Sequence, residues 1–134
     1  MNKRELATDV GLLLLRVGSA ATMLAVHGLA KVNNFSSLST KFPDPLTIGS
    51  KASLLLAIGS EVICSALVIL GLGTRIAAIP LWITMMVAAF LVHARDPFQK
   101  KELALLYALV FLVIALLGPG RYSLDQRFWP RKGR

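Results

Sequence analysis

The chain has 134 residues, of which 55% are hydrophobic and 16% charged, and its formal net charge is +8. This length allows one domain, residues 1–134. The hydrophobic share exceeds the soluble norm of roughly 45–50% and the charged share lies below about 25%, which excludes a water-soluble domain and a disordered chain. The only cysteine is Cys64, so a disulfide framework is excluded as well. The composition predicts a small integral membrane protein.

Four apolar stretches predict four membrane-spanning helices, because a span needs about 20 mainly apolar residues. They cover about residues 10–30, 52–73, 76–94 and 103–118. The fold class is therefore all-α: an up-down-up-down transmembrane four-helix bundle with short loops. A basic cytoplasmic tail, residues 119–134, follows the fourth span.

The lysines and arginines that flank the spans set the predicted orientation. With the N-terminus inside, eight of them lie on the inner side and six on the outer side, a bias that favours cytoplasmic N- and C-termini. The tail is expected to bind anionic lipid headgroups and not nucleic acid. Thr74, after the glycines that end the second span, is expected to cap the third helix.

Ionisable residues inside the predicted spans are candidates for function, because charged groups are costly in a membrane. These residues are Arg16, His27, Glu61 and His93, with Lys31 at the edge of the first span. At about 3.6 residues per turn, His27 and Lys31 follow Arg16 along one stripe of the first helix. We expect Arg16 and Glu61 to form a buried ion pair that fixes the helix packing, with direct participation in proton transfer as the alternative.

The depths of these residues suggest one pocket. At about 1.5 Å of rise per residue, the two histidines lie at a similar level near the outer ends of their helices, and the glutamate lies near mid-membrane. We expect an outer-leaflet pocket lined by His27, Lys31, Glu61, His93 and Tyr107.

Three kinds of chemistry suit such a pocket. The imidazoles could hydrogen-bond near the membrane interface, donate to a quinone carbonyl, or ligate a haem b as a pair. We favour the quinone over the haem, and the sequence predicts no other metal site. It has no phosphate-binding glycine-rich loop, so a flavin or nicotinamide would belong to a partner protein.

Four groups of residues carry a family resemblance. In chain order they are Arg16 with His27-Gly28-Leu29-Ala30-Lys31, then Glu61 with Gly71-Leu72-Gly73-Thr74-Arg75-Ile76-Ala77-Ala78, then His93, then Gly118-Pro119-Gly120-Arg121-Tyr122-Ser123-Leu124-Asp125. Over about residues 11–125, this order resembles the DoxX family of small four-span bacterial membrane proteins. The resemblance marks Arg75, Arg121, Tyr122, Ser123 and Asp125 as family positions at the turn and after the fourth span.

The resemblance implies a multi-pass protein of the bacterial inner membrane. Related DoxD-type proteins form the membrane subunit of thiosulfate:quinone oxidoreductase, and other members are partners in oxidative-stress complexes. Our first hypothesis is a quinone-interacting subunit, not an autonomous enzyme, which receives electrons from a protein partner that carries the redox cofactor. A non-catalytic anchor for a soluble redox enzyme and a small transporter, the latter as a homo-oligomer, stay open as alternatives. No residue is assigned a catalytic role.

Overall fold

The computed structural model describes residues 1–131, and this part of the chain is helical, without a strand. Several helices follow one another without a break, and three of the segments, marked η, are π-helical. The elements are α1 (Lys3–Thr22), η1 (Met23–Gly28), α2 (Leu29–Asn33), α3 (Phe35–Leu38), α4 (Ser50–Ile58), η2 (Gly59–Cys64), α5 (Ser65–Leu70), α6 (Thr74–Val87), η3 (Ala88–Val92), α7 (Phe98–Leu117) and α8 (Leu124–Phe128).

Three helices within the described residues are long and apolar enough to cross a membrane. They are Lys3–Asn33, Ser50–Leu70 and Thr74–Val92, of 31, 21 and 19 residues. The fourth predicted span corresponds to α7, a helix of 20 residues. It falls outside this group because charged residues occupy its first turns, namely Lys100, Lys101 and Glu102. A four-span membrane bundle therefore stays a prediction.

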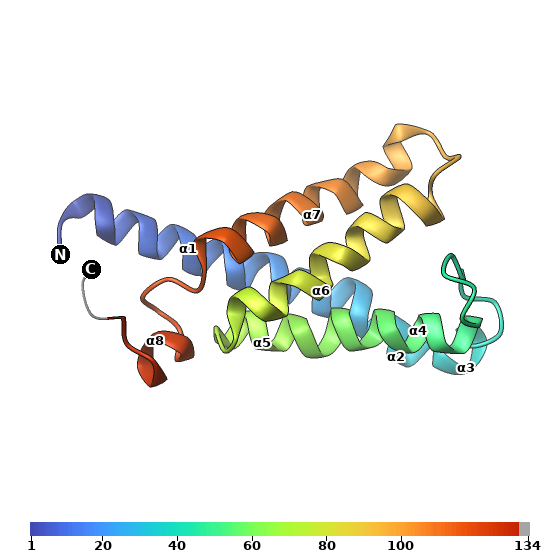
Figure 1. Cartoon of the computed structure of the whole chain (residues 1–134), viewed down its shortest axis with the longest axis horizontal. Helices are drawn as coiled ribbons and strands as arrows, with labels where there is room; N and C mark the ends of the chain where they lie inside the picture. The colour runs from blue at the N-terminus through green and yellow to red at the C-terminus, as the bar shows by residue number, and fades with distance from the viewer. Residues whose placement is uncertain (132–134) are drawn as a thin grey trace.

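The long helices run antiparallel in succession, and α1 lies beside the α4–α5 helix while α6 and α7 form a hairpin against them (Figure 1). The N-terminus and α8 lie at one end of the molecule, and α3 lies at the other end. Side chains such as Met23, Leu81 and Phe111 fill the core and are fully buried. The outer faces of the helices carry large exposed apolar side chains, among them Leu14, Leu56, Ile63, Ile76, Leu109 and Leu116. Such a surface suits contact with lipid.

The helix ends differ from the predicted boundaries for local reasons. Asn2 and Glu5 form a capping box, so α1 begins at Lys3 and extends before the predicted span. Gly71 takes a left-handed conformation (φ 72°), which ends the second helix at Leu70 and not at residue 73. Thr74 is the first residue of α6 and not its cap, which is Gly73.

The three π-helical segments change which residues face the interior. The buried positions of the first helix run through Arg16, Ala20 and Met23 and then to Gly28, a step of five residues across η1. The predicted stripe continued at His27, which is only half-buried. A π turn closes on the fifth residue instead of the fourth, and this shift turns His27 away from the buried line.

Gly28 allows the first two long helices to approach each other closely. A Cβ at this position would lie 2.8 Å from the Glu61 backbone oxygen and 2.9 Å from Val62 Cγ2. The absence of a side chain at Gly28 therefore sets η1 directly against η2, the segment that carries Glu61.

The loop before α4 is organised by Asp44. Its Oδ1 accepts hydrogen bonds from Ser53 Oγ (2.8 Å) and the Ile48 amide (3.0 Å), and its Oδ2 accepts one from the Gly49 amide (2.8 Å). The hydrogen bond from Ser53 is the main cause that holds the pKa of Asp44 below its usual value.

This lowered pKa predicts an acid-sensitive loop. A carboxyl whose pKa is lower in the folded chain stabilises fully above its unfolded pKa of about 3.9, and the contribution is lost as the pH falls through the folded value. We expect the hydrogen-exchange protection of the Ile48 and Gly49 amides to fall several-fold, to order of magnitude, below about pH 4. In Asp44→Asn, protection should be low already at neutral pH and show no such step. A step that persists in this variant would contradict the assignment.

Candidate functional site

Four of the five residues predicted to line a pocket lie around η1 and η2. We call His27, Lys31, Glu61 and Tyr107 the Lys31–Glu61 site. Its central contact joins Lys31 Nζ to Glu61 Oε2 at 2.7 Å. Glu61 is 3% exposed, so this ion pair lies largely out of solvent. A cationic partner at this distance offsets part of the cost of burying a carboxylate.

The predicted ion pair between Arg16 and Glu61 was wrong. Glu61 pairs with Lys31, and Arg16 Nη2 donates a hydrogen bond of 2.6 Å to the backbone oxygen of Tyr122. Arg16 lies about four turns before Lys31 on the first helix, so the two cations serve opposite ends of the molecule. The prediction placed Arg16 and Glu61 at neighbouring depths and did not include a backbone acceptor from the end of the chain.

His27 and Tyr107 form the second contact of the site. Their rings meet edge to face with centroids 5.7 Å apart, and Tyr107 stacks on Phe111 at 6.0 Å. Tyr107 comes from α7, so this contact joins the first and last long helices. His27 lies in the π-helical segment η1 and off the buried line of the first helix.

A shallow pocket of about 460 Å³ opens beside the ion pair. His27 and Lys31 contribute its ionisable side chains, and Asn34 and Ser37 add neutral polar groups. The remaining walls are apolar and come from Val26, Ala30, Leu38, Phe42 and Pro43. A mainly apolar pocket with a few polar groups is the usual form of a small-molecule site.

His93, the fifth predicted residue, pairs elsewhere. It follows η3, and its Nδ1 lies 2.7 Å from Asp96 Oδ2. This hydrogen bond is the main cause that lowers the pKa of the Asp96 carboxyl. At this end of the molecule the α6–α7 hairpin diverges from α2 and α4, which carries the end of η3 away from the Lys31–Glu61 site (Figure 1).

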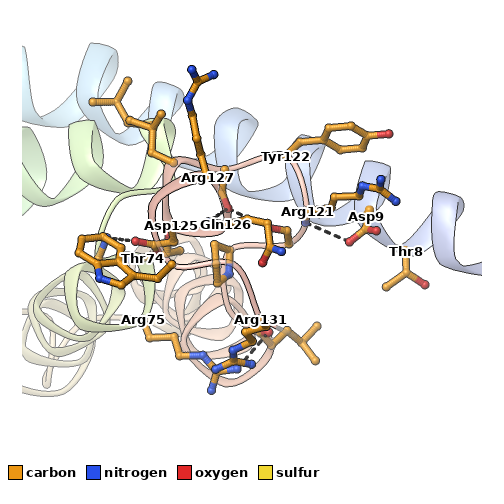
Figure 2. A pocket seen from close by; sticks show the side chains of 18 of the residues that line it. Thr8, Asp9, Thr74, Arg75, Arg121, Tyr122, Asp125, Gln126, Arg127 and Arg131 are labelled. Carbon is orange, nitrogen blue, oxygen red and sulfur yellow. Dashed lines mark hydrogen bonds between the residues drawn. The ribbon is translucent and has the colours of Figure 1, made fainter. Parts of the chain in front are cut away.

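The segment after α7 is folded back against the bundle, in contrast to the predicted tail. Arg121 donates its backbone N–H to Asp9 Oδ1 (3.1 Å; Figure 2). Ser123 caps α8 by accepting a hydrogen bond from the Gln126 N–H. We call residues 118–131 the C-terminal segment. The positions 132–134 of the predicted tail, with Lys132 and Arg134, lie outside the described residues.

Asp125 connects this segment to the start of α6. Its Oδ1 and Oδ2 accept hydrogen bonds from the backbone N–H groups of Gly73 (2.7 Å) and Thr74 (2.9 Å), and its own N–H donates to Gly71 O (2.8 Å). Figure 2 shows Asp125 directed at this turn. A carboxylate at a helix N-terminus satisfies N–H groups that have no partner within the helix.

The family positions noted in the sequence are thus brought together. Arg16 reaches Tyr122 past Gly71, where a Cβ would lie 1.8 Å from Arg16 Nη1. Arg75 lies over Gly118 and donates to Leu117 O at 3.3 Å. Three segments distant in the sequence therefore form one contact region at the end of the bundle where α1 begins.

Sequence reasoning missed the roles of Asp9 and Asp44, and it placed Arg16 with the wrong partner. It also missed the capping role of Asp125, for which one signal was available. Gly73, the residue before α6, has no side chain to cap the helix, so another residue must supply the cap. No comparable signal marks Asp9, whose partner is a backbone amide 112 residues away.

The described residues contain no group of three or more His, Cys, Asp or Glu side chains that could hold a metal ion. No solved structure matches this chain. Two uncharacterized proteins of Haemophilus influenzae are similar to it: one is 36% identical over 98% of this chain and 100% of its own length, and the other is 31% identical over 95% and 91%. An uncharacterized membrane protein of Mycobacterium tuberculosis is 38% identical over 53% of this chain and 52% of its own length.

The model of the DoxX family matches residues 11–94, which include η1, η2, η3 and the turn before α6. Together with the three apolar helices and the lipid-suited surface, the match identifies a membrane protein. The chain belongs to the DoxX family.

Proposed function

We propose that the chain binds a quinone at the Lys31–Glu61 site and acts as a membrane subunit of an oxidoreductase system. The observation that carries the proposal is the pocket of about 460 Å³, in which His27 and Lys31 lie among apolar walls beside the Glu61 carboxylate. The pocket volume falls in the range of roughly 300–1,000 Å³ that is usual for small-molecule sites.

The site offers the hydrogen-bond donors and the apolar contact that a quinone headgroup needs. A quinone headgroup is a flat apolar ring with two carbonyl oxygens, and when bound it supplies reversible two-electron, two-proton redox chemistry. The imidazole N–H of His27 and the ammonium of Lys31 are donors suited to a carbonyl oxygen. The ring of Phe42, which also lines the pocket, offers an apolar face.

Glu61 is placed to move a proton. Its Oε2 lies 2.7 Å from Lys31 Nζ, and Lys31 also lines the pocket, so a proton can pass between the pocket and the carboxylate through Lys31. The electrons would come from a protein partner with its own redox cofactor, because the chain has no flavin- or nicotinamide-binding motif. The chain would then position the quinone and conduct its protons.

The proposal includes the membrane arrangement. We propose that α7 is a fourth span, since residues 103–117 are uncharged and Lys100 and Lys101 can extend to the interface. Both termini would lie in the cytoplasm of a bacterial cell, and the Lys31–Glu61 site would open toward the outer leaflet of the inner membrane.

The test is retention of quinone by the purified full chain in lipid nanodiscs. We expect an oxidised-minus-reduced spectrum to show a quinone band in the ultraviolet without a Soret band. Binding of a short-chain ubiquinone or menaquinone should weaken about 10-fold in His27→Leu, because one hydrogen bond contributes about 1 kcal/mol or slightly more.

His93→Leu is the matched control, since it removes the same side chain at a position that is paired with Asp96. It should leave quinone binding unchanged. Equal losses in the two variants, or wild-type binding in His27→Leu, would reject the site. A Soret band would show a haem instead, and a protein that binds no quinone in retained lipid would favour the non-catalytic anchor.

A further inference from the structure

We propose a second binding site, at the opposite end of the molecule, for the phosphate headgroup of an anionic phospholipid. A cleft of about 1310 Å³ lies there between the N-terminal turns of α1, the start of α6 and the C-terminal segment. Arg75 and Arg131 are its main ligands, with Arg121 and Arg127 also on its walls. The chemistry recognised is a phosphate anion, and the source to which the site is suited is a lipid.

The carboxylates that line the cleft have hydrogen-bond partners, whereas its arginines have no ion-pair partner within the described residues. Its carboxylates already accept hydrogen bonds from backbone N–H groups: Asp9 from Arg121, Asp125 from Gly73 and Thr74, and Glu5 from Asn2. Among residues 1–131, none of the four arginines of the cleft forms an ion pair. The carboxylates thus bind backbone amides of the fold, whereas the four arginine side chains have no carboxylate partner in this part of the chain and can bind an anion.

Two of the cleft arginines extend in a common direction in one view of the site (Figure 2). In Figure 2 the Arg75 and Arg131 side chains extend to the same side of the site, whereas Arg127 extends to the opposite side. The hydrogen bond from Arg75 Nη2 to Leu117 O is long, at 3.3 Å, and leaves its other N–H groups available. A phosphate between two guanidinium groups would offset their repulsion and accept paired hydrogen bonds.

The surroundings of the cleft favour a lipid over a soluble phosphate. Apolar residues at the ends of three helices line it, namely Leu70, Ile76 and Leu117, and each is more than half exposed. Acyl chains can lie along these side chains while the headgroup reaches the arginines. Trp129, also on the wall, is 68% exposed, and tryptophan is enriched at the level of lipid headgroups.

The experiment uses native mass spectrometry of the full chain, released from nanodiscs of phosphatidylcholine with one fifth phosphatidylglycerol. We expect one phosphatidylglycerol to stay bound in preference to phosphatidylcholine. Removing one of the two main ligands with Arg131→Gln should weaken retention about 5-fold, because one charge near an anionic surface contributes about 1 kcal/mol. This side chain makes no hydrogen bond to the rest of the described chain, so the variant is expected to fold.

Arg75→Gln is a second variant, compared at equal monodispersity because Arg75 also contacts Leu117 and Gly118. Arg95→Gln removes the same charge outside the cleft and should retain the lipid. Equal binding of the two lipids, or equal losses in cleft and control variants, would overturn the proposal. Displacement of the lipid by millimolar inorganic phosphate would also overturn it, since the site would then select a soluble anion.

Discussion

Lys31→Met is expected to lower the free energy of unfolding by about 3–5 kcal/mol, the usual cost when one partner of a buried ion pair is removed. The cause lies with the residue that remains. Glu61 is 3% exposed, and without Lys31 Nζ at 2.7 Å its carboxylate would be a buried charge without a partner. The cost is the desolvation of this uncompensated group in the contact between η1 and η2.

The double variant Lys31→Met/Glu61→Leu separates this effect from lost packing. Because it removes both charges, we expect its stability to return to within about 1 kcal/mol of the wild-type value or above it. Unfolding by sodium dodecyl sulfate in mixed micelles gives these free energies. Lys51→Met, at an exposed position of α4, is the matched control and should have little effect. A double variant as unstable as Lys31→Met would contradict the ion-pair interpretation.

Quinone binding gives the double variant a second use. If the pair serves only to pack the helices, a stable double variant retains quinone as the wild type does. If it also supplies a donor to the pocket, the double variant is folded but has lost binding. The proposed function requires the second result.

Gly71→Ala is expected to destabilise the protein by about 3 kcal/mol, through two added costs. The left-handed conformation of Gly71 (φ 72°) costs an alanine about 1–2 kcal/mol. The new Cβ would also lie 1.8 Å from Arg16 Nη1 and 2.5 Å from Ser123 Cβ, and crowding of this kind costs about 1–3 kcal/mol. Arg16 is 2% exposed and held by Tyr122, so it has little room to move.

Gly73→Ala is the matched control for this prediction. Gly73 has a similar conformation (φ 58°), but nothing lies within 4 Å of the position of its Cβ. It should therefore cost only about 1–2 kcal/mol, the conformational part. The difference between the two variants, measured by thermal unfolding in one detergent, reports the contact of Arg16 with the turn. Equal effects would mean that the guanidinium moves aside without loss.

The fold was largely predictable because its determinants are local or repetitive. Apolar stretches of span length marked the long helices to within a few residues at most ends, and glycines marked the turn before α6. The π-helical segments were not predictable from the sequence. The apolar pattern was interpreted at about 3.6 residues per turn, and nothing in it indicates a turn closed by a hydrogen bond between residues i and i+5. That shift is why His27 left the predicted stripe.

Of the five residues predicted to line one pocket, His27 and Lys31 lie on its wall, Glu61 and Tyr107 contact these two without lining it, and the ion pair was assigned to the wrong cation. Depth estimates brought His27, Lys31, Glu61 and Tyr107 to one region, because rise per residue is constant along a helix. They could not give the crossing angle of the helices: the α6–α7 hairpin diverges from α2 and α4 (Figure 1), and His93, which follows η3, pairs with Asp96. Arg16 was misassigned for another reason: its partner is a backbone oxygen 106 residues away, and backbone acceptors leave no mark in a sequence.

The capping of α6 by Asp125 has a consequence for biosynthesis. During synthesis, Thr74 is added to the chain 51 residues before Asp125, the carboxylate that binds its N–H group. During that interval the amino end of the third long helix has its first N–H groups exposed to the interface, where water can hydrate them. Closure of this end is then among the last steps of assembly, after α7 has formed. A chain interrupted before Asp125 would keep its three apolar helices but lack the carboxylate that binds the Gly73 and Thr74 amides at the start of α6.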